Sequence, residues 1–216
     1  MKNLKLFSIA INKVIPLLIA FFFVSNASMA QVVSVTGNNN CTPNLATSYT
    51  SLSAAITALD AATSFSGPVT ITLNASNPQT APAGGYVINF AGATTATNNV
   101  TISGNNNTIT ASNALTAGNL TDAIFKIIGS DYVTIQNFTM QENASNTTTA
   151  AATNNMTEWG VALLYASTTN GAQNNTIKNN TISLNRNYAN TFGIYSNTRH
   201  TATSVTVAAE VTTSAG

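Results

Sequence analysis

Charged residues are rare in this sequence. Only 6% of its 216 residues are Asp, Glu, Lys or Arg, with seven basic and six acidic residues in all. A nucleic-acid backbone is bound by a face dense in Lys and Arg, and no such cluster occurs along this chain. No block of like charges forms an acidic or basic tail either. The composition therefore predicts no nucleic-acid partner.

Cysteine occurs once, at Cys41. A single cysteine excludes any disulfide within these residues, so the fold must be stabilised by its core. Cys41 also lies well beyond Ala30, whereas a lipid anchor needs its cysteine directly at a cleavage site. We interpret Cys41 as structurally incidental, or as paired with a group beyond Gly216.

Long hydrophobic runs are also missing. The longest, from Val14 to Val24, is roughly half of the ~20 apolar residues that cross a bilayer. Lysines precede it and the small residues of Ser28-Met29-Ala30 follow it, which is the pattern of a secretory signal peptide. We predict that residues 1–30 are a signal peptide, cleaved after Ala30. The mature chain is then secreted or exposed at the cell surface, without a membrane span.

The residues that are abundant favour β-structure. Apolar residues make up 44% of the chain, and the polar remainder is mostly Asn, Thr and Ser rather than the Glu and Lys of disordered segments. Thr, Val and Ile suit a pleated sheet, while Asn and Gly suit tight turns. Signal cleavage leaves four basic and six acidic residues, so the mature chain has a formal charge of −2.

The mature chain is expected to start with an irregular leader at residues 31–48, which has no sustained periodicity. Residues 49–62 then show apolar residues at helical spacing, namely Leu52, Ala55, Ile56 and Leu59. Ser51 or Thr50 is available as the N-cap. Gly67-Pro68 ends any helix and precedes the first strand.

From Val69 onward the period changes to two, and a unit of three short strands repeats. The first strands of successive units align as Thr101-Ile102-Ser103-Gly104, Thr134-Ile135-Gln136-Asn137 and Thr176-Ile177-Lys178-Asn179. Second strands follow at 108–110, 138–140 and 181–184, and third strands at 123–128, 161–165 and 192–195. The units differ in length only through loop insertions.

Stacking these units predicts a continuous core. The stacked column contains Ile71, Ile102, Ile135 and Ile177, with the preceding threonines facing outward. In the third strands, the position of Lys126 favours Phe125 and Ile127 as the buried pair over Ile124 and Ile128. The bend after each first strand requires a positive φ, which suits the residues found there, Gly104, Asn137 and Asn179.

At this point the sequence resembles a known family. The helix followed by Gly67-Pro68, and the unit from Asn174 to Ile182, are similar to the cap and coils of pectate-lyase-like right-handed β-helices, especially the large secreted ones of Bacteroidota. The resemblance covers most of residues 49–207. It implies an all-β fold, a right-handed parallel β-helix with three strands per coil and a short capping α-helix over its N-terminal end. It implies little about function, because many unrelated activities share such coils.

Candidate catalytic groups are few. Lyases and hydrolases on this fold need clustered carboxylates with a nearby Arg or Lys, or a spaced carboxylate pair. No two acidic residues of the mature chain are expected in the same column of successive coils; these residues are Asp60, Asp122, Asp131, Glu142, Glu158 and Glu210. Asp131 has the position of an Asx turn before a strand. We therefore predict no catalytic and no cofactor-binding residue in residues 31–216.

Metal and sugar sites are also weakly indicated. His200 has no Cys, Asp or second His at ligand spacing, which predicts no metal site. A small sugar-contacting patch, or merely solvated surface, is formed by the neighbouring residues Lys178, Arg186, Tyr188 and Arg199. Trp159 either stacks on a sugar or packs where a loop rejoins the coils. That loop, residues 141–158, is rich in Asn, Thr and Ala; its composition favours disorder, although a partner contact is an alternative.

Two functions are compatible with these features. The first is a structural or adhesive rod that presents loops to polysaccharide or to another cell surface. The second is a polysaccharide lyase or glycoside hydrolase whose active site lies in coils beyond residue 216. We expect such further coils of the same chain, because Ser204-Val205-Thr206-Val207 has the pattern of another first strand and no cap follows it. Alone, residues 31–216 are expected to self-associate through the open edge.

Overall fold

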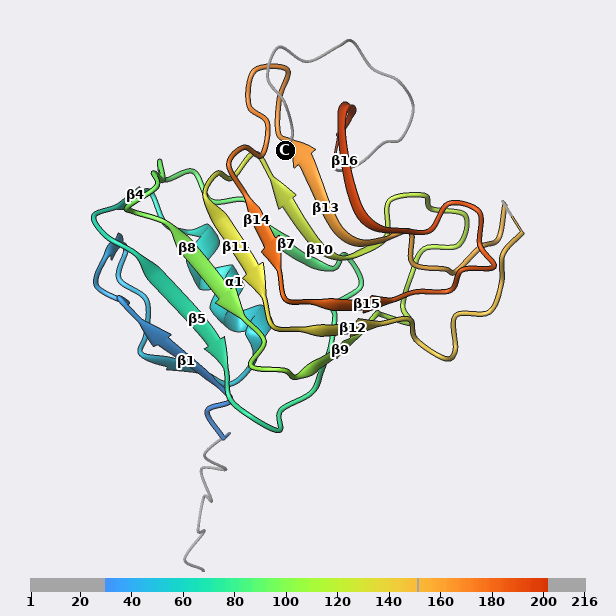
Figure 1. The fold of residues 1–216 in the computed structure, drawn as a ribbon, viewed down its shortest axis with the longest axis horizontal. Helices are drawn as coiled ribbons and strands as arrows, with labels where there is room; N and C mark the ends of the chain where they lie inside the picture. The colour runs from blue at the N-terminus through green and yellow to red at the C-terminus, as the bar shows by residue number, and fades with distance from the viewer. Residues whose placement is uncertain (1–29, 151, 202–216) are drawn as a thin grey trace, which may run out of the picture.

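The repeated strands stack into a parallel β-solenoid of about four turns in the computed structural model, which describes residues 30–150 and 152–201 (Figure 1). Corresponding strands of successive turns pair in parallel. The first sheet contains β5 (Val69–Leu73), β8 (Val100–Ser103), β11 (Val133–Gln136) and β14 (Thr176–Lys178). The second contains β6 (Gln79–Thr80), β9 (Thr108–Thr110), β12 (Thr139–Gln141) and β15 (Thr181–Ser183). The third contains β7 (Tyr86–Ile88), β10 (Ala123–Ile128), β13 (Trp159–Tyr165) and β16 (Phe192–Thr201).

The isoleucine column that the repeat predicts lies at the centre of the core. Its members are direct partners in the first sheet, in the order Ile71, Ile102, Ile135 and Ile177. The first three are fully buried, whereas Ile177 is only partly buried. The threonines one residue earlier point to the other side of the pleat and are partly or fully exposed. The predicted register is therefore confirmed.

The two central strands of the third sheet are buried on both faces. Every residue of β10 and β13 is buried. Phe125 and Ile127 belong to the main core, as predicted, but Ile124 does so as well. A second apolar cluster contains Ala123, Ile128, Trp159, Ala162 and Leu164. These strands therefore lack the alternation of a half-exposed sheet, and even Lys126 is only 7% exposed.

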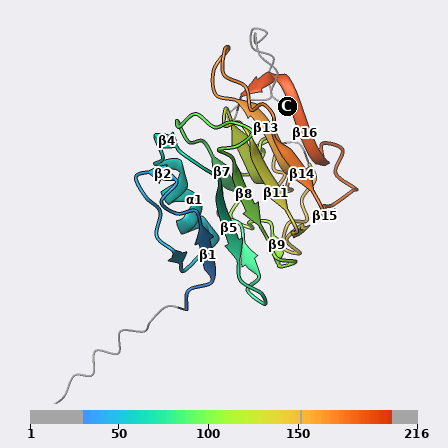
Figure 2. The ribbon, with the colours of Figure 1, turned by 60° about the vertical axis from the view of Figure 1, so that its left-hand side comes forward.

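Helix α1 (Leu52–Asp60) lies beside the first turn of the solenoid (Figures 1 and 2). The helical spacing in the sequence predicts its buried residues correctly: Leu52, Ala55, Ile56 and Leu59. Of the two N-cap candidates, Ser51 is the one used, because its hydroxyl accepts a hydrogen bond from the Ala54 N–H at 3.1 Å. The apolar face of α1 packs near β7 and β3 and joins the main core.

Residues 31–48 differ from the irregular leader that the sequence predicts. They contain β1 (Val33–Thr36), β2 (Cys41–Thr42) and the first residue of β3 (Ser48–Tyr49). Strand β1 pairs antiparallel with both β5 and β3, so the parallel first sheet continues into an antiparallel edge. Val33 and Val35 are buried and the residues between and after them are not. This alternation covers only four residues, which is too short to stand out from the Asn-rich sequence around it.

Cys41 is a packed residue of this N-terminal region. Strand β2 pairs antiparallel with β4 (Ser64–Phe65), and Cys41 lies opposite Phe65. Its side chain is 3% exposed, and its thiol donates to the Pro43 carbonyl at 3.4 Å. Burial raises the pKa of the Cys41 thiol, which keeps it protonated and unreactive. Cys41 is therefore a buried core residue instead of an incidental one.

The bends after the first strands use glycine and asparagine for two different reasons. Asn137 and Asn179 have φ values of 58° and 54°, as predicted. In the preceding turn the positive φ falls on Asn105 and Asn106 instead of Gly104. Gly104 is required by close packing, because a Cβ atom there would collide with the Phe138 ring and the Asn137 carbonyl. The prediction of Gly104 as a left-handed residue was therefore wrong.

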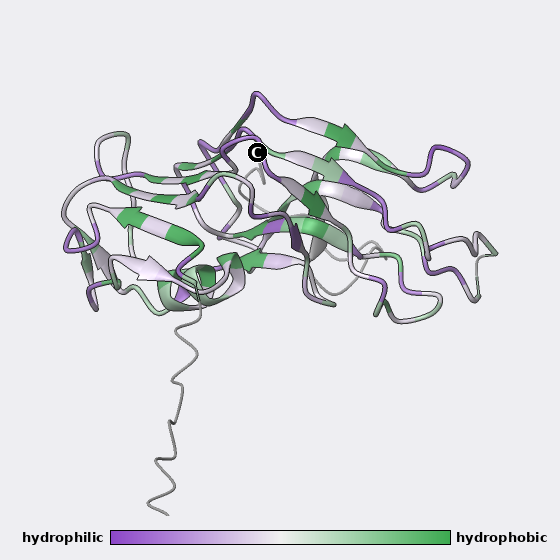
Figure 3. Cartoon of the chain, turned by 90° about the horizontal axis from the view of Figure 1, so that it is seen from below, coloured by the Kyte–Doolittle hydropathy of each residue, from purple (hydrophilic) through white to green (hydrophobic). Residues whose placement is uncertain are grey.

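Asparagine side chains also connect one turn to the next where the strand ladders are interrupted. Asn180 Oδ1 accepts from the Phe138 N–H at 2.9 Å, while its Nδ2 donates to the Ile135 carbonyl at 2.9 Å. Asn175 bridges Val133 and Ser130 in the same way. An amide side chain both donates and accepts, so it can replace a backbone group at a bend. Figure 3 shows the result, with apolar colour in the strands and polar colour in the turns.

Candidate functional site

Three loops leave the solenoid between its second and third strands and lie against one another (Figure 1, right-hand side). We call them the second-turn loop (111–122), the third-turn loop (142–150 and 152–158) and the fourth-turn loop (184–191). Asn143 and Asn146 of the third-turn loop donate to the Ala111 and Ser112 carbonyls of the second-turn loop at 3.1 and 2.9 Å. The Glu142 N–H donates to the Ser183 carbonyl at 2.9 Å. The loops therefore continue the stacking of the turns.

The third-turn loop is packed, although its composition favours disorder. Its ends are joined by Glu142, whose carboxylate accepts from the Thr157 hydroxyl at 2.8 Å and from the Thr157 N–H at 3.1 Å. Asn146 and Asn154 are 3% and 0% exposed. Hydrogen bonds from amide side chains therefore order this segment, which has no apolar core of its own. Hydrophobic periodicity in the sequence cannot reveal this kind of order.

Two acidic residues occupy equivalent positions at the base of these loops. Asp122 directly precedes β10 and Glu158 directly precedes β13, and the first residues of these strands are partners. Glu158 Oε2 accepts from the Asp122 N–H at 2.9 Å, and the Glu158 N–H donates to the Asp122 carbonyl at 3.1 Å. The prediction that no two acidic residues share a column is therefore wrong.

A sequence signal for this pair does exist. Asn119-Leu120-Thr121-Asp122 and Asn155-Met156-Thr157-Glu158 share a pattern of Asn, an apolar residue, Thr and an acid directly before the third strand. An alignment anchored on the third strands reveals it. An alignment anchored on the first strands does not, because the third-turn loop is longer than the second-turn loop.

Both carboxyl groups are almost completely removed from solvent. Asp122 is 3% exposed and Glu158 is 1% exposed. Asp122 Oδ1 accepts from Asn119 Nδ2 at 3.0 Å. Within the described residues, however, Asp122 Oδ2 and Glu158 Oε1 are buried and have no hydrogen-bond partner. A buried carboxylate oxygen without a donor is costly, so each such oxygen needs an explanation.

Burial of the two carboxyl groups raises their affinity for protons. Burial raises the pKa of Glu158 from 4.5 to about 7, although the hydrogen bond from the Asp122 N–H opposes this shift. Burial also raises the pKa of Asp122, and the neighbouring Glu142 charge adds to the effect. Burial lowers the pKa of Lys126, against the attraction of both acids. The pair is therefore partly protonated near neutral pH.

This pair is unsuited to act on a substrate directly, because neither side chain reaches the surface. A metal role is not indicated either. Among residues 30–150 and 152–201, no group of three or more His, Cys, Asp or Glu is arranged to hold a metal ion.

A surface groove of about 390 Å³ lies over the outward face of the first sheet. We call it the threonine groove. Its floor includes Thr101, Thr134 and Thr176, which are direct partners in β8, β11 and β14. Tyr132 and Lys178 also line it. These hydroxyl groups repeat at the strand spacing of about 4.8 Å, so the groove presents a regular polar ladder.

Tyr132 has an unusual backbone conformation at this groove. Its φ is 51°, which is rare for a bulky residue and unfavourable by about 1–3 kcal/mol. Its N–H donates to the Gln173 carbonyl of the next turn at 3.1 Å, and Gln173 in turn donates to the Asp131 carboxylate at 2.6 Å. Asp131 therefore connects two turns. The sequence had suggested instead that it closes an Asx turn.

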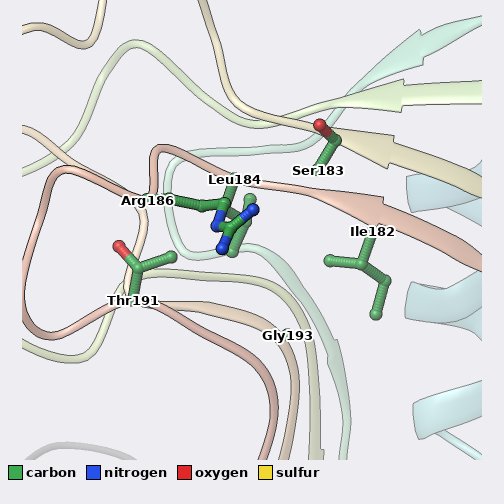
Figure 4. A pocket seen from close by; sticks show the side chains of 6 residues that line it. All are labelled: Ile182, Ser183, Leu184, Arg186, Thr191 and Gly193. Carbon is green, nitrogen blue, oxygen red and sulfur yellow. The ribbon is translucent and has the colours of Figure 1, made fainter.

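Two further hollows involve the fourth turn. One, of about 490 Å³, lies between the third-turn loop and β15 and is lined mostly by amide and carboxylate side chains. The other, of about 430 Å³, lies beside Ile182, Leu184 and Arg186 (Figure 4). In the same turn Phe192 and Ile194 are 47% and 52% exposed. Apolar side chains that the earlier turns bury are therefore accessible in the fourth.

The described members of the predicted sugar-contacting patch have different surroundings. Lys178 lies in the threonine groove, whereas Arg186 lines the hollow beside Ile182 and Tyr188 is 5% exposed in the fourth-turn loop. The side chains of Arg199 and His200 and all of Glu210 lie outside the described part of the structure. Trp159 is 2% exposed and stacks on Tyr195 at 4.5 Å, which confirms the packing role.

Comparison with family models, with curated proteins and with solved structures finds no match. The fold assignment therefore rests on the sequence repeat and the observed solenoid. No helix within the described residues is long and apolar enough to cross a membrane.

Proposed function

We propose that this chain belongs to an exported structural or adhesive protein that contacts carbohydrate through the threonine groove. In this proposal the solenoid is a right-handed β-helix with three strands per coil, of the pectate-lyase-like type found in secreted proteins of Bacteroidota. Each of three sheets receives one strand from every turn, which supports the strand count. Crossovers between parallel strands of one sheet are almost always right-handed, which supports the handedness.

Export is supported by the signal-peptide pattern of residues 1–30. A structural role is supported by the stacked build of the molecule, in which strands and loops both repeat from turn to turn. The scarcity of exposed charge favours an uncharged or weakly charged partner over a nucleic acid.

The observation that carries the proposal is the composition of the threonine groove. Its hydroxyl groups and the amides of Asn99 and Asn174 both donate and accept hydrogen bonds, as sugar hydroxyls do. Tyr132 adds an aromatic ring, which suits the apolar face of a sugar. Its unfavourable φ marks a position where backbone strain is retained.

A binding assay on the exported chain tests this proposal. Binding to neutral polysaccharides, with the polyanions pectin, alginate and glycosaminoglycan as the charged comparison, is measured by affinity electrophoresis and calorimetry for the native chain, Thr134→Val and Tyr132→Asn. Asn tolerates a positive φ, so the second change removes the ring without new strain. We expect at least about tenfold weaker binding for each variant.

Thr139→Val is the matched control, because Thr139 is also partly exposed but lies in β12, away from the groove. It should bind like the native chain. Absence of binding to every polysaccharide, or equal weakening by all three changes, would reject the groove. Release of unsaturated or reducing sugars by the chain would instead favour a lyase or hydrolase.

A further inference from the structure

The base of the three stacked loops holds a charge arrangement that the threonine groove does not use. Asp122 ends the second-turn loop and Glu158 ends the third-turn loop. The Glu158 carbonyl accepts from the Phe192 N–H at 2.7 Å, where the fourth-turn loop ends. All three loops therefore rejoin the solenoid at this pair.

The hydrogen bonds of the pair are incomplete in a specific way. Each carboxyl group has one oxygen bonded to a protein donor, namely the Asp122 N–H or Asn119 Nδ2. The second oxygen of each, Asp122 Oδ2 and Glu158 Oε1, is buried without a partner in the described residues. Two ionised groups in this state would leave two negative charges in surroundings that exclude water.

We propose that Asp122 and Glu158 form a proton-operated latch that keeps the stacked loops packed when the pair holds a proton and releases the third-turn loop when both carboxyls are ionised. A proton removes one negative charge and adds an O–H donor to the pair. Ionisation restores mutual repulsion and the full cost of burial, and opening of the loop relieves both by admitting water.

The titratable groups around the pair come from three elements. Lys126 of β10 attracts both carboxylates, but one positive charge offsets only one of the two negative ones. Glu142, the first residue of the third-turn loop, adds electrostatic repulsion toward the Asp122 carboxylate. Tyr188 of the fourth-turn loop lies next to Glu158, and burial raises the pKa of its hydroxyl, so it stays neutral over the relevant range. As a hydrogen-bond partner, this hydroxyl lowers the pKa of Glu158, but the effect of burial is larger.

The titration range supports the proposal. The pKa of Glu158 is raised to about 7 and that of Asp122 is also raised, both chiefly by burial. The latch would therefore be closed in mildly acidic surroundings and would open as the pH rises above neutrality. For one proton released, the opening constant increases by up to about tenfold per pH unit above that point.

Trp159 provides a direct reporter of the latch. It is the single tryptophan of the chain, it follows Glu158 directly, and it is 2% exposed. The fluorescence of the chain is measured between pH 5 and 9. We expect the emission to shift to longer wavelength with a midpoint near pH 7 as water reaches the indole. Glu158→Gln, which keeps the side-chain shape without the charge, should keep the short-wavelength emission throughout.

A second variant and a second measurement guard against misfolding. Asp122→Asn should also remove the fluorescence transition. Amide hydrogen exchange within 145–157, corrected for intrinsic rates, should become faster as the pH rises in the unsubstituted chain but not in the two variants. Asp60→Asn is the control, because the carboxylate of Asp60, the last residue of α1, is partly buried, also has a raised pKa and accepts from the Asn89 backbone N–H, away from the loops. It should leave the Trp159 transition unchanged.

Three results would overturn the latch. The first is that neither the Trp159 emission nor the hydrogen exchange of the third-turn loop changes between pH 5 and 9 in the unsubstituted chain. The second is a transition that persists in both Glu158→Gln and Asp122→Asn. The third is recovery of the closed state at pH 8 on addition of calcium, because the pair would then hold a cation in place of a proton.

Discussion

At the scale of single residues, the isoleucine column determines how the turns pack. Ile135 is fully buried between Ile102 and Ile177. Truncation leaves a cavity that neighbouring turns cannot fill, so Ile135→Ala should lower the free energy of unfolding by about 2–5 kcal/mol in urea denaturation. Ile177→Ala is the matched comparison and should lose less, because Ile177 is partly buried. An unchanged midpoint for Ile135→Ala would contradict the register.

Gly104 tests a different contact at the same scale. A Cβ atom there would collide with the Phe138 ring and the Asn137 carbonyl, so Gly104→Ala should destabilise the chain by about 1–3 kcal/mol. Gly84→Ala is the control, because an added Cβ at Gly84 meets nothing within 4 Å. Similar thermal midpoints for the two variants would show that the bend shifts freely to accommodate the methyl group.

Residues that repeat in phase with the first strands were predicted from the sequence, whereas residues whose repeat is visible only from the third strands were missed. The isoleucines align because each turn repeats the same first strand. The pairing of Asp122 with Glu158 depends on loops of unequal length that return to the same place. Trp159 left two interpretations open, and only its contact with Tyr195 decides between them.

At the scale of elements, helix α1 depends on a single capping residue. Ser51 accepts from the Ala54 N–H, whereas Thr50 has no such contact in the described N-cap geometry. Ser51→Ala should therefore lower the free energy of unfolding by about 0.5–2 kcal/mol, measured by chemical denaturation. Thr50→Ala should have little effect. A larger loss at Thr50 than at Ser51 would place the start of the helix elsewhere.

The elements that sequence reasoning missed share one physical cause. Strand β1 is ordered by pairing with β5, and the third-turn loop is ordered by amide and carboxylate hydrogen bonds. Neither depends on a long hydrophobic period. Periodicity detects elements that bury a face, as α1 and β5 do, but it is insensitive to segments held by side-chain polar groups at short range.

At the scale of the whole molecule, the repeat was sufficient to predict a parallel solenoid. Strands far apart in sequence pair in the predicted register because the same residue faces inward in every turn. Phe192 and Ile194 of the fourth turn are exposed, whereas their partners in the preceding turn, Trp159 and Val161, are buried. The repeat of the first strands did not predict the burial of acidic side chains where the loops rejoin the turns.

These buried acidic side chains give the free energy of unfolding an unusual dependence on pH. Buried carboxyls with raised pKa values bind protons more tightly in the folded state than in the unfolded state. The pKa of Glu158 rises from 4.5 to about 7 and that of Asp60 from 3.8 to about 6, so over this window the folded chain holds more protons. The contribution of these carboxyls to the free energy of unfolding then falls as the pH rises from about 4.5 to about 7, which is the reverse of ordinary acid denaturation.

We therefore expect the chain to unfold at lower urea concentration at pH 8 than at pH 5. Glu158 contributes at most about 3 kcal/mol to this difference, and solvent screening near the loop ends reduces it. Glu158→Gln should remove most of the difference, while Asp60→Asn should remove a smaller part centred at lower pH. Greater stability at pH 8 than at pH 5 would contradict the raised carboxyl pKa values, because a stability that rises with pH across this window requires a group that holds more protons in the unfolded chain, such as a base like Lys126 whose pKa is lowered by burial.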